Sequence, residues 1–260
     1  MRGRRWILPI LLVAGFLGLW ELAAHLGWLN PSLMSSPSRI ADALWKTHVR
    51  RLPERSILLT HIGVSLQRVF LAGMIGTGSG VLIGILMGTS RVVYRLFDPI
   101  VTLLMPIPGI AQAPLFIVWL GFGDPTIITV GAIASFFPIA FNTAAGVRSV
   151  DGQLVRAARL MGVSPAGCLP RVYLPSAAGH IMAGVKLGWA RCWRTVIAVE
   201  FVAAASWGLG YMIWDASEYI RSGVVFGGIL LLMLVYFAME RVVLEGVERL
   251  TVRRWGMIQS

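Results

Sequence analysis

Four charged side chains fall inside one apolar stretch of the chain, and one of them, Lys186, lies near enough to its end to reach the membrane interface. Arg191, Arg194 and Glu200 lie within segment 179–206. In a membrane span, each charge would cost about 2.5–3.5 kcal/mol on insertion scales, so such residues are expected to face a cavity or to pair. The two arginines are three residues apart and share a helix face, and guanidinium groups bind planar anions through two hydrogen bonds. The three residues are therefore candidates for a path that attracts a small anion.

The same charges also fit a structural role. At about 100° per residue, Glu200 points away from both arginines, so a pair within the helix is not expected. The arginines then have three candidate partners: Glu200 of a second copy, Glu21, or backbone carbonyls freed by prolines in segment 98–121. The sequence leaves both roles open.

Motifs of covalent chemistry are missing or incomplete. There is no His-Glu-x-x-His or Gly-x-Ser-x-Gly, and the two cysteines fit no metal spacing. A P-loop needs Gly-Lys-Ser/Thr, but the two lysines follow Trp45 and Val185. Residues 121–124 match the Gly-x-Gly-Asp of intramembrane aspartyl proteases, yet that chemistry needs a second carboxylate, and we interpret them as a turn. The sequence predicts no enzyme, no metal and no cofactor, and any ATP chemistry must belong to another chain.

The elements that hold these residues are predicted from composition. Of the 260 residues, 57% are hydrophobic and 13% charged, whereas soluble domains carry about 25% charged residues. Apolar runs long enough to span a membrane occur six times, at about 6–27, 61–89, 98–121, 126–147, 179–206 and 223–244. Segment 207–222, between the last two runs, is expected to be a turn. The net charge of +11 is interpreted as basic cytoplasmic loops rather than as a nucleic-acid surface.

Orientation follows from the basic residues between the spans. With the N-terminus inside, the inner segments hold twelve Lys and Arg and the outer segments six, which predicts that both termini are cytoplasmic. Five of the outer six lie in segment 28–60, which also holds a short amphipathic pattern. We expect this segment to lie at the interface and to contact lipid headgroups.

Two patterns within the spans concern packing. Glycines recur every four residues in the second span, a pattern that lets another helix approach closely; they are Gly76, Gly80, Gly84 and Gly88. The third span is interrupted by Pro106, Pro108 and Pro114, which free backbone carbonyls that protein or water must satisfy. A kinked pore-lining helix and a helix broken for packing fit the prolines equally well.

The polar segment 148–178 is too long for a minimal turn and too polar to span. Small and apolar residues recur there at helical spacing, with Asp151 as the expected N-cap and Gly162 as the stop. A short amphipathic helix of this kind suits docking into a groove of a partner protein. A surface helix resting on the membrane is the alternative.

A family resemblance rests mainly on this segment. Ala157-Ala158-x-x-x-Gly162, nine residues, then Val172-Tyr173-Leu174-Pro175 resembles the EAA signature of ABC importer permeases, with Arg156 in place of the usual Glu. Nearly the full chain resembles the taurine, alkanesulfonate and nitrate branch. The other matching pieces are Ser36-Pro37-Ser38, Pro106 to Gly121, Phe137-Pro138-Ile139, Asn142-Thr143, Val199-Glu200 and Gly208 to Tyr211.

The resemblance implies a type I permease fold, an all-α membrane protein of six transmembrane helices with a cytoplasmic coupling helix. It divides the chain into an N-terminal span with its external segment (1–60), a permease core (61–245) and a cytoplasmic tail (246–260). The implied partners are a cytoplasmic ATPase dimer, a second permease copy and an extracytoplasmic substrate-binding protein, in a bacterial inner membrane. The implied ATPase-coupling residues are Arg156, Ala157, Ala158, Gly162, Leu174 and Pro175.

Two other function classes stay open at this point. A stand-alone channel or secondary carrier for a small anion would use pore-lining charges in the same way, and a structural membrane subunit would need none. The 148–178 segment separates them, because a channel has no use for a cytoplasmic docking helix.

Overall fold

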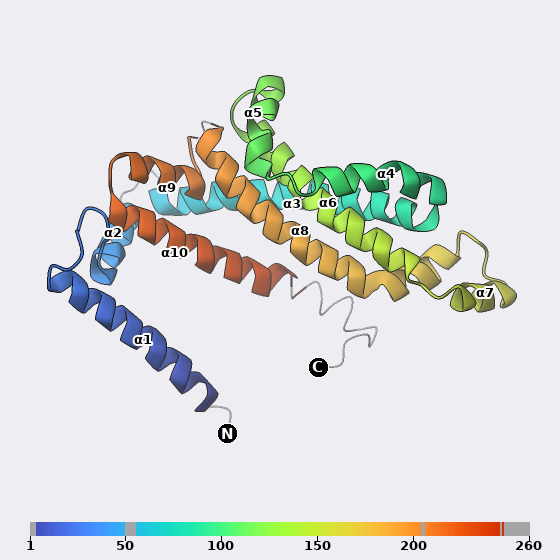
Figure 1. The fold of residues 1–260 in the computed structure, drawn as a ribbon, viewed down its shortest axis with the longest axis horizontal. Helices are drawn as coiled ribbons and strands as arrows, with labels where there is room; N and C mark the ends of the chain where they lie inside the picture. The colour runs from blue at the N-terminus through green and yellow to red at the C-terminus, as the bar shows by residue number, and fades with distance from the viewer. Residues whose placement is uncertain (1–3, 50–55, 204–205, 245, 247–260) are drawn as a thin grey trace. The chain divides into compact units, whose positions relative to one another are not determined.

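The computed structural model describes residues 4–49, 56–203, 206–244 and 246, and these residues are helical with no strand (Figure 1). The predicted all-α class is confirmed. In chain order the elements are α1 (Arg4–His25), α2 (Pro37–Val49), α3 (Ile57–Thr89), α4 (Arg91–Leu104), α5 (Gly109–Leu120), α6 (Asp124–Arg148), α7 (Gly152–Leu160), the π-helical turn η1 (Leu169–Tyr173), α8 (Leu174–Val202), α9 (Leu209–Glu218), α10 (Ser222–Met239) and the π-helical turn η2 (Glu240–Leu244).

Each predicted span corresponds to a helix or to a bent pair of helices. By length and composition, α1, α3, α6 and α10 could cross a membrane, and α4 with α5 adds a fifth crossing if the pair is one span. The remaining predicted span, 179–206, corresponds to α8, which has 29 residues and is about 44 Å long at 1.5 Å per residue. Its length suits a span, but its four charged residues lower its hydropathy.

Two segments differ from the sequence-based expectation. The third span begins earlier, at Arg91, and consists of two helices bent by 105°. Pro106 and Pro108 lie in the break, because neither can donate a backbone hydrogen bond, whereas Pro114 lies inside α5 and does not interrupt it. Segment 207–222, expected to be a turn, contains α9.

The described residues form two compact units. The first comprises those up to Val64 together with Trp207–Val235, and the second comprises those between Ser65 and Ser206 together with those from Tyr236 on. The predicted tail 246–260 lies outside the described residues except for residue 246, as do three of the five basic residues of segment 28–60.

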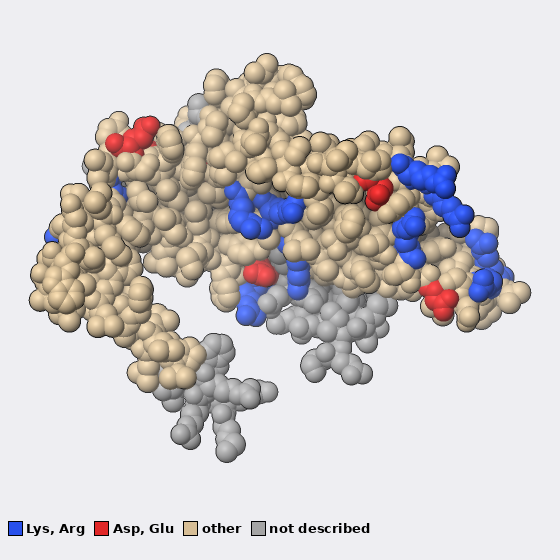
Figure 2. Space-filling model, viewed as in Figure 1, with Lys and Arg blue, Asp and Glu red and all other residues tan. Residues whose placement is uncertain are grey.

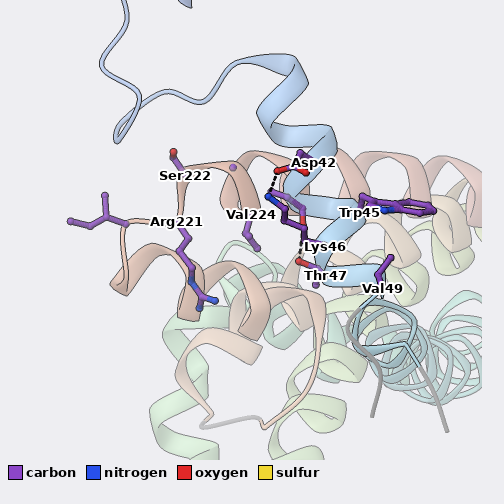
Figure 3. A pocket seen from close by; sticks show the side chains of 11 residues that line it. Asp42, Trp45, Lys46, Thr47, Val49, Arg221, Ser222 and Val224 are labelled. Atoms are coloured by element: carbon purple, nitrogen blue, oxygen red, sulfur yellow. Dashed lines mark hydrogen bonds and ion pairs between the residues drawn. The ribbon is translucent and has the colours of Figure 1, made fainter. Parts of the chain in front are cut away.

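In the first unit, α1 holds the beginning of α2. The Glu21 carboxylate accepts hydrogen bonds from the Ser38 backbone N–H at 3.0 Å and from its hydroxyl at 2.6 Å. The predicted amphipathic helix in segment 28–60 is confirmed as α2, with Ile40 buried. A cavity of about 750 Å³ lies between α2 and the turn before α10 (Figure 3), where Lys46 pairs with Asp42 at 2.6 Å.

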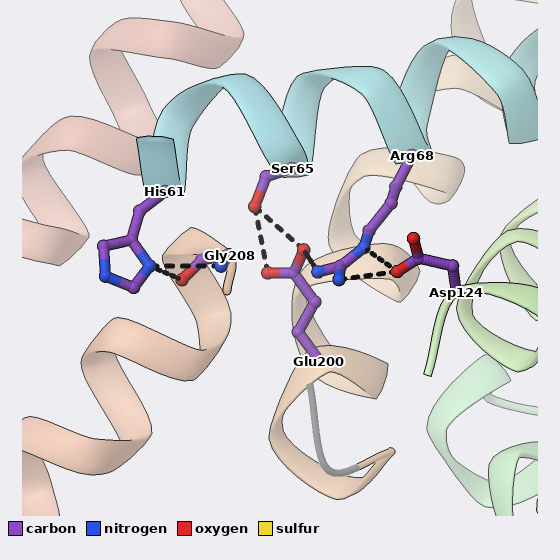
Figure 4. Close-up of polar contacts among 6 residues, drawn as sticks. All are labelled: His61, Ser65, Arg68, Asp124, Glu200 and Gly208. Carbon is purple, nitrogen blue, oxygen red and sulfur yellow. Dashed lines mark hydrogen bonds and ion pairs between the residues drawn. The ribbon is translucent and has the colours of Figure 1, made fainter. Parts of the chain in front are cut away.

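The beginning and end of α9 are fixed within the same unit. Gly208, with φ of 136°, precedes the helix, and its N–H donates to His61 Nδ1 at 3.1 Å (Figure 4). At the other end, Ile220 takes a φ of 53°, a left-handed conformation that β-branched residues rarely adopt. Arg221 N–H then reaches back to the Ala216 carbonyl at 2.8 Å, which closes the helix in a Schellman motif.

In the second unit, α3 and α6 pack through the four glycines that recur every four residues on α3, which we call the glycine stripe. A Cβ atom added at any of the four glycines would lie between 1.9 and 2.9 Å from a side-chain atom of α6. The side chains met by Gly76, Gly80, Gly84 and Gly88 are, in order, Ser135, Ile139, Thr143 and Val147. The two backbones can therefore approach only because these positions lack side chains.

The helices α6 and α8 are also joined through glycines. A Cβ atom would meet Val196 at 2.7 Å if added at Gly131, and Ile139 at 2.6 Å if added at Gly188. Near the opposite end of α6, one added at Gly146 would meet His180 at 2.5 Å. The contacts run along most of both helices, so α3, α6 and α8 form one tightly packed three-helix layer.

Candidate functional site

The break between α4 and α5 lines a cavity of about 390 Å³ in the second unit. The other wall comes from α6 and α8, and α5 begins against α8, where a Cβ at Gly109 would lie 2.3 Å from Thr195 Cγ2. The lining residues are Met105, Pro106, Ile107, Pro108, Gly109, Ile110, Gln112, Ala134, Phe137, Arg191, Arg194, Thr195 and Ala198. The structure thus brings both arginines and two of the three third-span prolines, Pro106 and Pro108, to one place.

Both arginines bond to backbone carbonyls. Arg191 Nη1 donates to the Met105 carbonyl at 2.9 Å, and Arg194 Nε donates to the Ala190 carbonyl at 3.2 Å. Met105 precedes the first proline of the break, so Arg191 satisfies a carbonyl that an unbroken helix would have bonded internally. No carboxylate of the described residues pairs with either arginine. Arg191 therefore both stabilises the break and lines the cavity.

Glu200 lies elsewhere in the second unit and is not among the cavity-lining residues. Its side chain is fully buried and accepts hydrogen bonds from Ser65 Oγ at 2.9 and 3.0 Å and from Arg68 Nη1 at 2.8 Å (Figure 4). Arg68 also donates through Nε to Asp124 at 2.8 Å. The assignment of Glu200 to the substrate path stays a prediction.

Sequence reasoning missed Arg68. The available signal was a single cation in the apolar second span, where an uncompensated charge is costly and a buried partner is expected. The residue that it meets on α6, Asp124, starts the helix after Gly121 and Gly123, with φ values of 79° and 96°. The interpretation of residues 121–124 as a turn is therefore confirmed.

The helix expected in segment 148–178 is α7. The Asp151 carboxylate accepts from the Gln153 N–H at 2.8 Å and caps the helix. At the other end, Gly162 has a φ of 86°, and the Val163 N–H bonds the Ala158 carbonyl at 3.1 Å. Both predicted helix ends are confirmed. The chain then continues through η1 into α8, which begins at Leu174 with Pro175 in its first turn.

The surface of α7 is apolar on its open side. Val155 and Ala158 are buried, while Arg156 and Ala157 are exposed. Three large apolar side chains point outward, with exposed fractions of 55% at Leu154, 90% at Leu160 and 78% at Met161. Basic side chains gather around α7 and the beginning of α4 (Figure 2). The helix thus presents apolar side chains rimmed by arginines, an arrangement typical of a protein-binding surface.

The chain combines apolar helices long enough to span a membrane, an interrupted span, a cationic cavity and an exposed helical loop. These features are those of a solute permease. Comparison with known proteins agrees. Residues 80–249 match the family described as binding-protein-dependent transport system inner membrane component. The chain belongs to this family.

Individual relatives refine the comparison. The chain is 33% identical to the taurine transport system permease protein TauC of Escherichia coli (strain K12), over 91% of this chain and 86% of that protein. It is 31% identical to the putative aliphatic sulfonates transport permease protein SsuC of Bacillus subtilis (strain 168), over 88% and 81%. An inward-facing MetNI methionine ABC transporter structure shares the fold, with a TM-score of 0.58 and 21% identity over 76% of this chain and 99% of that chain.

These findings decide among the classes left open by the sequence. The chain is the membrane-embedded permease subunit of an ABC importer and not an enzyme, and the predicted family, fold and transport role are confirmed. Membership of the family implies an ATPase and a substrate-binding protein as partners.

Proposed function

We propose that this permease moves a small anion of the taurine, sulfonate or nitrate type by alternating access, through the cavity that Arg191 and Arg194 line. The single observation that carries the proposal is the presence of both Arg191 and Arg194 in the lining of a cavity of about 390 Å³ beside a broken helix. Irregular backbone at membrane depth is tolerated where it lines a water-filled cavity. The names of the relatives support the same substrate class.

Weak binding is required at such a site, because the solute must leave it again. Arg191 is held by the Met105 carbonyl, whereas Arg194, which is exposed, bonds the Ala190 carbonyl of its own helix. Arg194 is therefore the more adaptable anion contact. A guanidinium can present two parallel N–H groups to an oxyanion, which a lysine cannot do.

The test is uptake into proteoliposomes that contain the permease, its ATPase and its binding protein, with taurine, methanesulfonate and nitrate as probes. We expect Arg194→Gln to lower uptake strongly while expression and ATPase docking stay normal. Arg191→Gln should lower uptake and also stability, since it exposes the Met105 carbonyl. Arg171→Gln, an exposed arginine outside the cavity, is the control. Unchanged uptake of every probe in Arg194→Gln refutes the path.

We also propose that α7 is the coupling helix that docks in the ATPase, on the cytoplasmic side. The exposed Leu154, Leu160 and Met161 support this role, because a monomeric surface rarely exposes such side chains together. Arg156, where the family signature has Glu, should meet an acidic patch in the partner's groove. Ala158→Glu is expected to abolish co-purification of the ATPase, and retained co-purification with normal transport would exclude this surface.

The permease is proposed to act as a homodimer, because one chain supplies one docking helix while the ATPase works as a dimer and closed two-fold symmetry is the simplest arrangement. A native mass with one permease copy per complex would refute it.

Both termini are proposed to face the cytoplasm of a bacterial inner membrane, with segment 28–60 in contact with external headgroups. Thiol labelling of Trp45→Cys from outside intact cells tests the orientation.

A further inference from the structure

Four polar residues meet at the end of the three-helix layer that is farthest along α6 from α7. This Arg68 cluster consists of Ser65 and Arg68 on α3, Asp124 at the beginning of α6 and Glu200 near the end of α8 (Figure 4). Arg68 contacts Asp124 through Nε at 2.8 Å and Nη2 at 2.7 Å, and Glu200 through Nη1 at 2.8 Å. One guanidinium therefore ties three helices together.

The two acidic partners of Arg68 differ sharply in exposure. The side chain of Glu200 is 0% exposed and that of Arg68 is 6% exposed, whereas that of Asp124 is 60% exposed. Removing either member of the buried pair would leave an uncompensated buried charge, so separating Arg68 from Glu200 would cost much free energy. The ion pair between Arg68 and the exposed Asp124 can therefore be altered without leaving a buried charge unpaired.

The turn before α6 is fastened to the same place. The Gly123 N–H donates to the Ala203 carbonyl at 3.0 Å, which joins the beginning of α6 to the end of α8 by the backbone as well. α6 has 25 residues, so this junction lies about 37 Å from the α7 end of the helix. Between the two ends, glycine contacts hold α6 to both α3 and α8.

We propose that Arg68 is the positioning residue that makes this layer move as one body in the transport cycle. The inference rests on the proposed function, because it takes α7 as the point where ATP-driven motion enters and the arginine cavity as the place where it must arrive. Motion delivered at α7 reaches the cavity wall on α6 and α8 only if the distant ends of these helices cannot slide apart. Arg68 prevents that sliding by holding Asp124 and Glu200 on one planar group.

The experiment uses the complete importer and a cysteine in the cavity. Ile110→Cys places a thiol on the exposed lining of the α4–α5 break, and both native cysteines are buried, so the unsubstituted chain supplies the background. The rate of labelling by a polar thiol reagent is compared with and without ATP and vanadate. The variants are Asp124→Asn and Arg68→Lys, because a lysine can bond Glu200 but cannot bridge both carboxylates. Asp42→Asn is the matched control, since Asp42 is 57% exposed and also pairs with a cation.

The expected result is that ATP alters the labelling rate in the parent and in Asp42→Asn, and that this alteration shrinks by about fivefold or more in both cluster variants, as for lost coupling between distant sites. ATPase co-purification and hydrolysis should persist. A cluster of purely structural importance would lower thermal stability and leave the ATP-dependent change intact, which overturns the inference. If ATP alters nothing in the parent, the cavity is not the path, and the proposed function fails together with the inference.

Discussion

The close approach of α3 and α6 predicts a large penalty for a single methyl group at Gly84. A Cβ there would lie 2.5 Å from Thr143 Cβ and 2.7 Å from the Ala140 carbonyl oxygen. The carbonyl belongs to the backbone, so no side-chain rotation removes the clash. Restoring ordinary contact distances requires α6 to retreat by roughly 1 Å, a gap at which packed atoms lose about a quarter to a half of their attraction.

The same helix offers a matched control. Gly78 is exposed, and a Cβ at that position meets no atom within 4 Å. Both substitutions gain about 1 kcal/mol of helix propensity, whereas overpacking costs typically about 1–3 kcal/mol. Gly78→Ala should therefore be neutral or stabilising, and Gly84→Ala should be less stable than Gly78→Ala by about 1–3 kcal/mol.

Stability can be read from the fraction of monodisperse detergent-purified permease that survives a series of heating steps. We expect the Gly84→Ala curve to shift to lower temperature and the Gly78→Ala curve to stay at or above that of the parent. Equal curves for the two variants would refute the argument that the glycine stripe sets the distance between α3 and α6.

Further predictions concern helix ends and one polar contact. Ile220→Gly should raise stability by about 0.5–1 kcal/mol, because glycine takes the left-handed conformation without the steric cost borne by isoleucine; lower thermal stability would contradict this. Asp151→Ala should lose about 1 kcal/mol of cap energy and weaken ATPase co-purification, with Asp151→Ser as the restoring control. Gly162→Ala should act similarly at the other end of α7, where φ is 86°. Thr77→Val removes the acceptor of the Trp189 indole N–H at 3.0 Å and should lower the melting temperature, whereas Thr77→Ser should not.

Local patterns in the sequence sufficed where the interaction is local. The caps of α7 depend on Asp151 and Gly162 themselves, and the four-residue spacing of the glycines marks one face of α3 without knowledge of the partner helix. Composition alone separated the spans, because hydrocarbon excludes charge in every fold. The family signature in segment 148–178 is likewise a matter of spacing.

Pairings across the fold could not be derived in this way. The contact between Arg68 and Glu200 joins residues 132 positions apart, and no periodicity indicates which cation meets which acid. The 105° bend between α4 and α5 places the beginning of α5 against α8, where Gly109 meets Thr195, so the prolines predicted a break but not its angle. The helix α9 was taken for a turn because its ten residues are too short to stand out by hydropathy.

The glycine stripe leaves the α3–α6 interface with an ambiguity that the rest of the structure must resolve. Gly76, Gly80, Gly84 and Gly88 repeat every four residues and face residues of α6 that repeat equally, so the two parallel helices could slip by one turn and still present three glycines to the partner. Such a slip would displace Arg68 by about 6 Å relative to Asp124 and separate two charges that now touch. The glycine stripe therefore lets α3 and α6 pack closely without fixing their register. The ion pair between Arg68 and Asp124 selects one register among several.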